Sequence, residues 1–92
     1  MRMMLTFRIP VEKGNEAEAD GSMRKAIEKL VADTNAEAAY FTMIDGLRGG
    51  IIIFEETDQA NLTRHNEPMF AALNAAIDIV PVLTLEDLKR GL

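Results

Sequence analysis

Two strand-like runs, residues 3–9 and 50–54, carry large apolar side chains at odd and even positions alike. Successive side chains of a strand point to opposite faces, so a sheet built from these runs has apolar surface on both sides. The chain also contains two amphipathic helical stretches, which are enough to cover one face. The other face needs a second cover, most simply the same face of another copy. The pattern therefore predicts a homodimer.

Turn and breaker residues divide the chain into four predicted strands, at residues 2–9, 38–44, 47–55 and 79–83. The first strand ends before Pro10, and Pro81 places the last strand at a sheet edge, because proline cannot donate to a ladder. Asp45-Gly46 is a strong signal for a type I′ hairpin, in which both central residues have positive φ. This turn predicts the pairs Ile44–Leu47, Thr42–Gly49 and Tyr40–Ile51. A bulge at Gly49-Gly50 is the alternative and would shift that register by one residue.

The first helical region is predicted from Ser22 to Asp33. Its apolar stripe has helical spacing and comprises Met23, Ala26, Ile27, Leu30 and Val31. Upstream, Gly14 marks a turn. Asn15 is predicted to be a helix N-cap, with Glu18 three residues later as its capping-box partner. The segment from Asn15 to Asp20 is then either a separate turn or a frayed first turn.

The second helical region is predicted in two pieces, Gln59–His65 and Pro68–Ile77, with a break near Asn66-Glu67-Pro68. The stripe of the second piece is Met69, Phe70, Leu73, Ala76 and Ile77. After the last strand, Thr84 caps a short helix with Asp87 as its capping-box partner.

The resulting order, β-α-β-β-α-β, predicts a single α+β domain over residues 1–92 with a ferredoxin-like fold. Its four-stranded antiparallel sheet has the strand order 4-1-3-2 and carries both helices on one face. This order makes the first and third strands central, in agreement with their two-sided apolar character.

In this arrangement the sheet side chains that face the helices are almost free of polar atoms. They are Met3, Leu5, Phe7, Ile9, Phe41, Met43, Ile52 and Phe54. The opposite face is mixed: Met4, Thr6, Arg8, Ala38, Tyr40, Thr42, Ile51, Ile53 and Glu55. A mixed face of this kind suits an interface that encloses a small polar cavity. Strand pairing is expected to set Arg8, Ile51 and Tyr40 in one row.

The candidate ligand-binding residues are Arg8, Tyr40, Thr6, Thr42 and His65. The Arg8 guanidinium suits a carboxylate or phosphate, and the alternative is an ion pair at the rim of the sheet. Tyr40 offers a phenol to a ligand, or else it is an interface aromatic.

His65 is the only histidine, and with Glu67 it would form an acid–base pair at the helix break. The alternative, which we favour, is a solvated polar turn. Asn74 lies in the apolar stripe and, if buried, is expected to make a structural hydrogen bond.

Composition narrows the function classes. The net charge of −5 and a pI near 4.8 disfavour nucleic acid, which requires clustered basic residues. No apolar run approaches a membrane span, and the N-terminus turns polar too soon for a signal peptide. The absence of cysteine excludes disulfides, and one histidine makes a poor metal site. We expect a cytoplasmic protein with no cofactor, metal, membrane or nucleic-acid partner.

Several segments carry a family resemblance: Ala39-Tyr40-Phe41-Thr42 before the hairpin, Glu67-Pro68-Met69-Phe70, Asn74-Ala75-Ala76, Pro81-Val82, Thr84 and Glu86-Asp87-Leu88. With these the chain resembles a family of small uncharacterised bacterial proteins in the dimeric α/β-barrel superfamily. The resemblance implies that two sheets close into a barrel, with a ligand between sheet and helices or inside the barrel. It transfers no activity, since the superfamily includes monooxygenases, isomerases, haem-degrading enzymes and simple binding proteins.

Two functions follow as hypotheses. The favoured one is a homodimeric module that binds a small molecule, with a small organic anion as the expected ligand. The alternative is a cofactor-independent monooxygenase or isomerase that acts on a small aromatic or apolar acid. There Arg8 would hold the acid, and Tyr40 or His65 would handle the proton.

Overall fold

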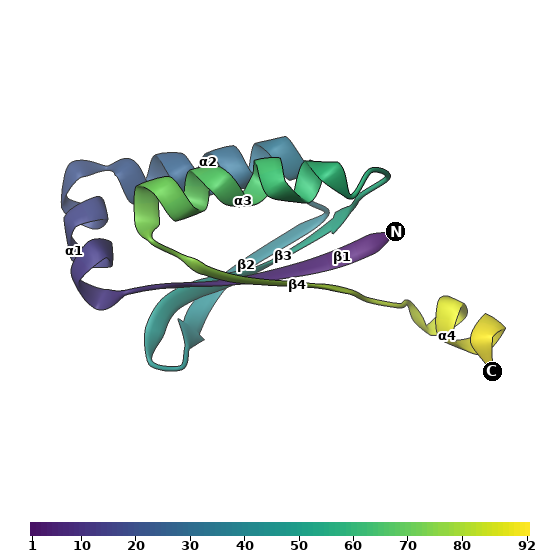
Figure 1. The fold of residues 1–92 in the computed structure, drawn as a ribbon. Coiled ribbons are helices and arrows are strands. Elements are labelled where there is room, and N and C mark those ends of the chain that lie inside the picture. Colours follow the sequence, from purple (N-terminus) through teal and green to yellow (C-terminus); the bar gives the residue numbers. More distant parts are fainter.

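The computed structural model describes residues 1–92 as one four-stranded antiparallel sheet with its two longest helices on one face (Figure 1). The elements are β1 (Arg2–Ile9), α1 (Val11–Asp20), α2 (Ser22–Thr34), β2 (Ala38–Ile44), β3 (Leu47–Glu55), α3 (Ala60–Leu73), β4 (Ala76–Pro81) and α4 (Leu85–Gly91). The sheet order is β2-β3-β1-β4, which confirms the predicted order and the ferredoxin-like arrangement. Two further helices lie outside the β-α-β-β-α-β core: α4, which the capping signal at Thr84 predicted, and α1, which was not predicted.

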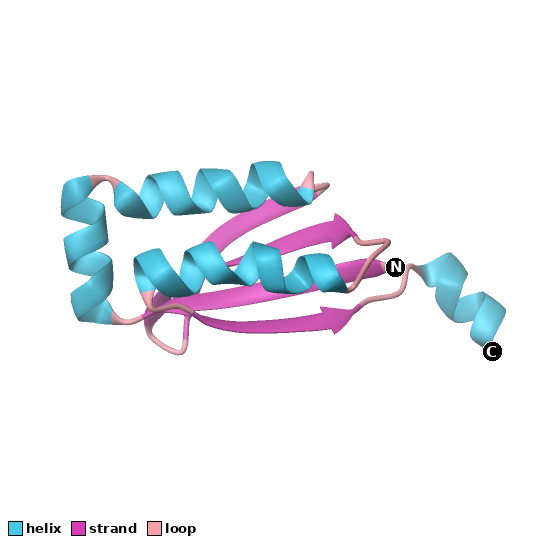
Figure 2. Cartoon of the chain, turned by 45° about the horizontal axis from the view of Figure 1, so that its top comes forward, coloured by secondary structure: helices cyan, strands magenta, loops and turns pink.

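The core lies between the sheet and the pair α2 and α3, which run side by side across it (Figure 2). Along β1 the side chains alternate between buried and half-buried, so the odd positions face the helices as predicted. Leu5 and Ile52 of the central strands and Met69 and Leu73 of α3 are fully buried. No helix covers the other face, which we call the open face.

The β2–β3 hairpin has the predicted turn and register. Asp45 and Gly46 have φ values of 53° and 76°, as a type I′ turn requires. Ile44 pairs with Leu47, Thr42 with Gly49 and Tyr40 with Ile51. The ladder runs without a bulge, so the alternative at Gly49-Gly50 is wrong.

The Gly46→Val variant is expected to lower the free energy of unfolding by roughly 1–2 kcal/mol, because a β-branched residue is strained at positive φ. Nothing lies within 4 Å of the added Cβ, so backbone strain is the sole cost. Urea unfolding with Gly91→Val as the control measures this difference. An unchanged transition midpoint would contradict the expectation.

The segment before α2 is a complete helix, so the predicted turn at Gly14 and the cap at Asn15 are wrong. α1 begins directly after Pro10, whose carbonyl accepts a hydrogen bond from the Gly14 N–H at 2.8 Å. Gly14 and Ala17 are buried in tertiary contacts, which outweigh the poor helix propensity of glycine. Gly21, with φ of 81°, ends α1 and leads into α2.

The predicted break before Pro68 is also wrong, because α3 continues through this proline. The complete burial of Met69 just beyond it offsets the lost hydrogen bond. The helix ends at Asn74, which is exposed and left-handed with φ of 51°. Asn74 is therefore a C-cap. β4 then starts at Ala76, three residues earlier than predicted, and Ile77 belongs to this strand.

The last helix, α4, has the predicted capping box between Thr84 and Asp87. It projects beyond the sheet, away from the other helices (Figures 1 and 2), and none of its residues is buried. The longest helix, α3, has 14 residues, and no helix combines the length and apolar character needed to cross a membrane.

Candidate functional site

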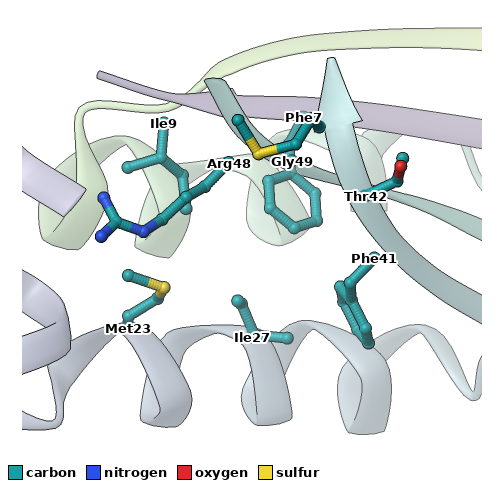
Figure 3. Close-up of a pocket in the computed structure, with 9 residues that line it drawn as sticks. Phe7, Ile9, Met23, Ile27, Phe41, Thr42, Arg48 and Gly49 are labelled. Atoms are coloured by element: carbon teal, nitrogen blue, oxygen red, sulfur yellow. The ribbon is translucent and has the colours of Figure 1, made fainter. Parts of the chain in front are cut away.

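A cavity of about 240 Å³ lies between α2 and the end of the sheet near the β2–β3 hairpin (Figure 3). We call it the α2 cavity. Met23 and Ile27 of α2 point toward the sheet, and the Phe41 ring points toward α2. Six of the nine lining residues are hydrophobic, and the full lining is Phe7, Ile9, Met23, Ile27, Phe41, Thr42, Met43, Arg48 and Gly49. The volume is just below the range of about 300–1,000 Å³ that encloses a drug-sized molecule. The space therefore suits a small ligand with an apolar body.

A pair of aromatic rings forms one wall of the α2 cavity. The centroids of Phe7 and Phe41 are 6.4 Å apart, and the rings are tilted by 56°. Gly50 lies between them, since a Cβ there would be 2.8 Å from atoms of both rings. The glycine therefore allows β1 and β2 to bring their aromatic side chains together across β3.

Arg48 is the only charged residue that lines the α2 cavity, and it is partly buried. Its Nη2 donates to Asn15 Oδ1 of α1 at 3.0 Å, and it forms no ion pair. A Cβ at Gly14 would lie 2.6 Å from Arg48 Nη1. The missing side chain at Gly14 thus leaves the room in which the guanidinium lies against α1.

A second hollow of about 200 Å³ adjoins the α2 cavity and shares Met23, Ile27 and Phe41 with it. Its other lining residues are Glu18, Arg24 and Glu28. Glu18 and Glu28 outnumber Arg24 at this end, whereas Arg48 is the only charged residue at the other. The net charges of the two linings therefore favour an anion beside Arg48.

On the open face, Arg8 is held by two aspartates. Its Nη1 is 3.1 Å from Asp78 Oδ2 and its Nε is 3.8 Å from Asp45 Oδ2, with 24% of the side chain exposed. β1 pairs Arg8 with Gly49, so the predicted row of Arg8, Ile51 and Tyr40 is wrong by two residues. The register depends on backbone pairing between strands far apart in sequence, which side-chain alternation does not specify.

The other three candidate residues of the open face, Thr6, Tyr40 and Thr42, lie in two rows. Tyr40, Ile51, Thr6 and Asp78 form one row across the sheet. Thr42 lies in the next row, which also contains Arg8. Tyr40 is 67% exposed. The structure thus brings Thr6, Arg8, Tyr40 and Thr42 together and leaves His65 apart from them; their ligand-binding role stays a prediction.

His65 is not part of a solvated turn. Its side chain is only 9% exposed, and its Nε2 is 2.9 Å from Oε1 of Glu56, which is equally buried. The ring also packs edge-on against Phe54 at a centroid distance of 5.6 Å. The partner of His65 is therefore Glu56, which directly follows β3, and not Glu67 as expected. The reason is that α3 is uninterrupted and places the His65 side chain in the interior.

Glu56 receives several further hydrogen bonds. Asn61 Nδ2 donates to Glu56 Oε2 at 3.0 Å, and the backbone N–H groups of Thr57 and Asp58 donate at 3.1 and 3.3 Å. The Asn61 bond, with those from His65 and Asp58, outweighs burial and lowers the pKa of Glu56 to about 2. This cluster fastens the start of α3 to β3.

Three residues of the α2 cavity region were missed by sequence reasoning: Arg48, Gly14 and Asn15. Strand alternation does contain the signal for Arg48, because it shares a face with Gly50, Ile52 and Phe54. A charged residue on an otherwise apolar helix-facing row is uncommon. Gly14 and Asn15 had no such signal, since their role depends on a helix that was not predicted.

Fold and site together define a small α+β domain with one covered sheet face, one open face and an apolar cavity beside a single arginine. The chain belongs to the family described as a domain of unknown function (DUF3303), whose model matches residues 1–92. Comparison with curated proteins finds no match.

Proposed function

We propose that this protein is a homodimeric module of the dimeric α/β-barrel type that binds a small molecule in the α2 cavity. One observation carries the binding function: the cavity is apolar, yet it ends at a guanidinium that has no carboxylate partner. A largely apolar hollow with one fixed polar group is typical of ligand sites. Such a group orients a ligand, while the walls supply the burial energy.

The open face supports the homodimer. Three of its rows carry exposed or half-buried apolar side chains, and no helix of the same chain covers them. They include Met4, Ile51, Ile53, Val80 and Leu47. An uncovered sheet face with apolar side chains of this kind is typical of a protein interface. A second copy supplies an equally apolar and self-complementary cover.

Proton-transfer chemistry is not favoured, because the candidate residues lie outside the α2 cavity. Tyr40 is on the open face. His65 packs on Phe54, which is six residues along β3 from Arg48, a distance of about 20 Å. A monooxygenase or isomerase would need such a group within hydrogen-bond reach of its substrate. Binding without turnover is therefore the function that we propose.

The Ile27→Trp variant tests the cavity. Wild-type protein is screened by thermal unfolding against aromatic and short-chain carboxylates, and binders are expected to raise Tm. A ligand at 100 times its Kd stabilises by about 2.7 kcal/mol. The tryptophan fills the cavity, so we expect the ligand-induced shift to disappear while the variant still unfolds cooperatively.

Ala32→Trp is the matched control, because Ala32 lies on α2 but is exposed and does not line the cavity. It should keep the full shift. Either a wild-type protein that no compound stabilises or an Ile27→Trp variant with an undiminished shift would overturn the proposed site.

A further inference from the structure

We propose that the α2 cavity binds a small monocarboxylate, with the carboxylate on Arg48 and the apolar body between Ile27 and the Phe7–Phe41 pair. This inference rests on the proposed binding function and adds the chemical class of the ligand. It also assigns the anion to the helix-facing side of the sheet, in contrast to the sequence-based assignment to Arg8.

The three arginines in the sheet differ in their partners. Arg2 is paired with Glu37 at 2.8 Å, and Arg8 is paired with Asp78 and Asp45. Arg48 has only the neutral oxygen of Asn15. A guanidinium has five N–H donors, so Arg48 keeps most of them available in the fork geometry that matches a carboxylate. A partly buried guanidinium without a counter-ion is the group that gains most from binding an anion.

Helix α1 positions the arginine. Gly14 weakens helix α1, but its missing side chain leaves space for the Arg48 guanidinium. A Cβ at Gly14 would lie 2.6 Å from Arg48 Nη1. Asn15, the next residue, holds Nη2 by its side-chain oxygen. Two neighbouring residues of α1 therefore fix both the location and the rotation of one guanidinium at the cavity.

The site carries one positive charge, which suits a monoanion better than a phosphate monoester or a dicarboxylate. Glu18 and Glu28 outnumber Arg24 in the lining of the adjoining hollow, so a second negative charge on the ligand would meet a net negative surface there. The small volume and the aromatic wall select a compact, apolar acid.

The test compares carboxylates with their neutral amides: phenylacetate with phenylacetamide, and hexanoate with hexanamide. Kd values are measured by titration calorimetry on the full chain. We expect the carboxylates to bind roughly tenfold or more tightly than the amides, as a charge-assisted pair implies. Arg48→Ala should remove this preference, and Arg48→Lys should restore only part of it because an ammonium lacks the two-donor fork.

Gly14→Ala is the sharper variant, because it introduces no polar group and favours the helix. The clash falls on the far end of a flexible arginine, so the fold is kept while the guanidinium moves. We expect unchanged or higher Tm with weaker carboxylate binding. Arg8→Ala, on the opposite face, is the control and should bind like wild type.

The outcomes separate the two proposals. Equal affinity for acid and amide, or loss of the preference in Arg8→Ala and not in Arg48→Ala, would overturn the inference and leave the binding function standing. Absence of binding by every compound would overturn the proposed function itself. A carboxylate preference that Arg48→Ala and Gly14→Ala both reduce would support the inference.

Discussion

The wild-type protein is expected to be dimeric at micromolar concentrations, and the Ile53→Glu variant is expected to be monomeric at the same concentrations. Ile53 lies in the row Ala38–Ile53–Met4–Val80 of the open face, within central strand β3. A sheet-to-sheet dimer would bury the new carboxylate twice, at a cost of several kcal/mol per site if it finds no partner. The monomer fold is kept, because the side chain points away from the helices. Light scattering and sedimentation measure the change.

Ala32→Glu is the matched control, since it adds the same charge to the exposed side of α2. It should remain dimeric. A wild-type protein that is monomeric at these concentrations would overturn the homodimer. A dimeric Ile53→Glu variant would show that the two copies meet elsewhere.

The second large effect is a loss of stability in acid that depends on Glu56. Its pKa is lowered from 4.5 to about 2 in the folded protein, so folding favours the ionised form. The resulting stabilisation is present above pH 4.5 and is lost as the pH falls toward 2. The size of the shift sets an upper bound of about 3 kcal/mol on this stabilisation, and screening by solvent lowers it.

Urea unfolding of wild type and Glu56→Gln between pH 2 and pH 7 measures this contribution. The variant should be less stable than wild type near neutrality, and the gap should close toward pH 2. Comparison with Glu55→Gln, an exposed neighbour, removes the general effect of losing a carboxylate. A gap that stays constant with pH would show that Glu56 contributes through packing alone.

Strand patterns were read correctly from sequence where turn chemistry and alternation act together. Asp45-Gly46 fixed the register of β2 and β3, and Pro10 marked the end of β1. Each of these two signals depends only on neighbouring residues and allows a single structural interpretation. The first and third strands are central in the sheet, as their apolar character on both sides predicted.

Errors arose where tertiary contacts override a local signal. Gly14 and Pro68 both discourage helix, and both lie inside helices whose neighbouring residues are buried. The misplaced break at Pro68 in turn placed His65 in solvent and not beside Glu56. The position of the Arg48 side chain could not be predicted either, because α1, which holds it through Gly14 and Asn15, was not recognised as a helix.

The projecting helix α4 has a folding equilibrium of its own. Every residue of the core and of the layer packed on it precedes Val80, so the domain does not need α4 to fold. Seven residues form a marginal helix in water even with a capping box. Leu85 and Leu88 remain 63% and 45% exposed, so their burial stabilises the helix only weakly. The backbone amides of α4 are consequently expected to exchange with solvent far faster than those of α3. We also expect α4 to unfold and refold without unfolding of the rest of the domain.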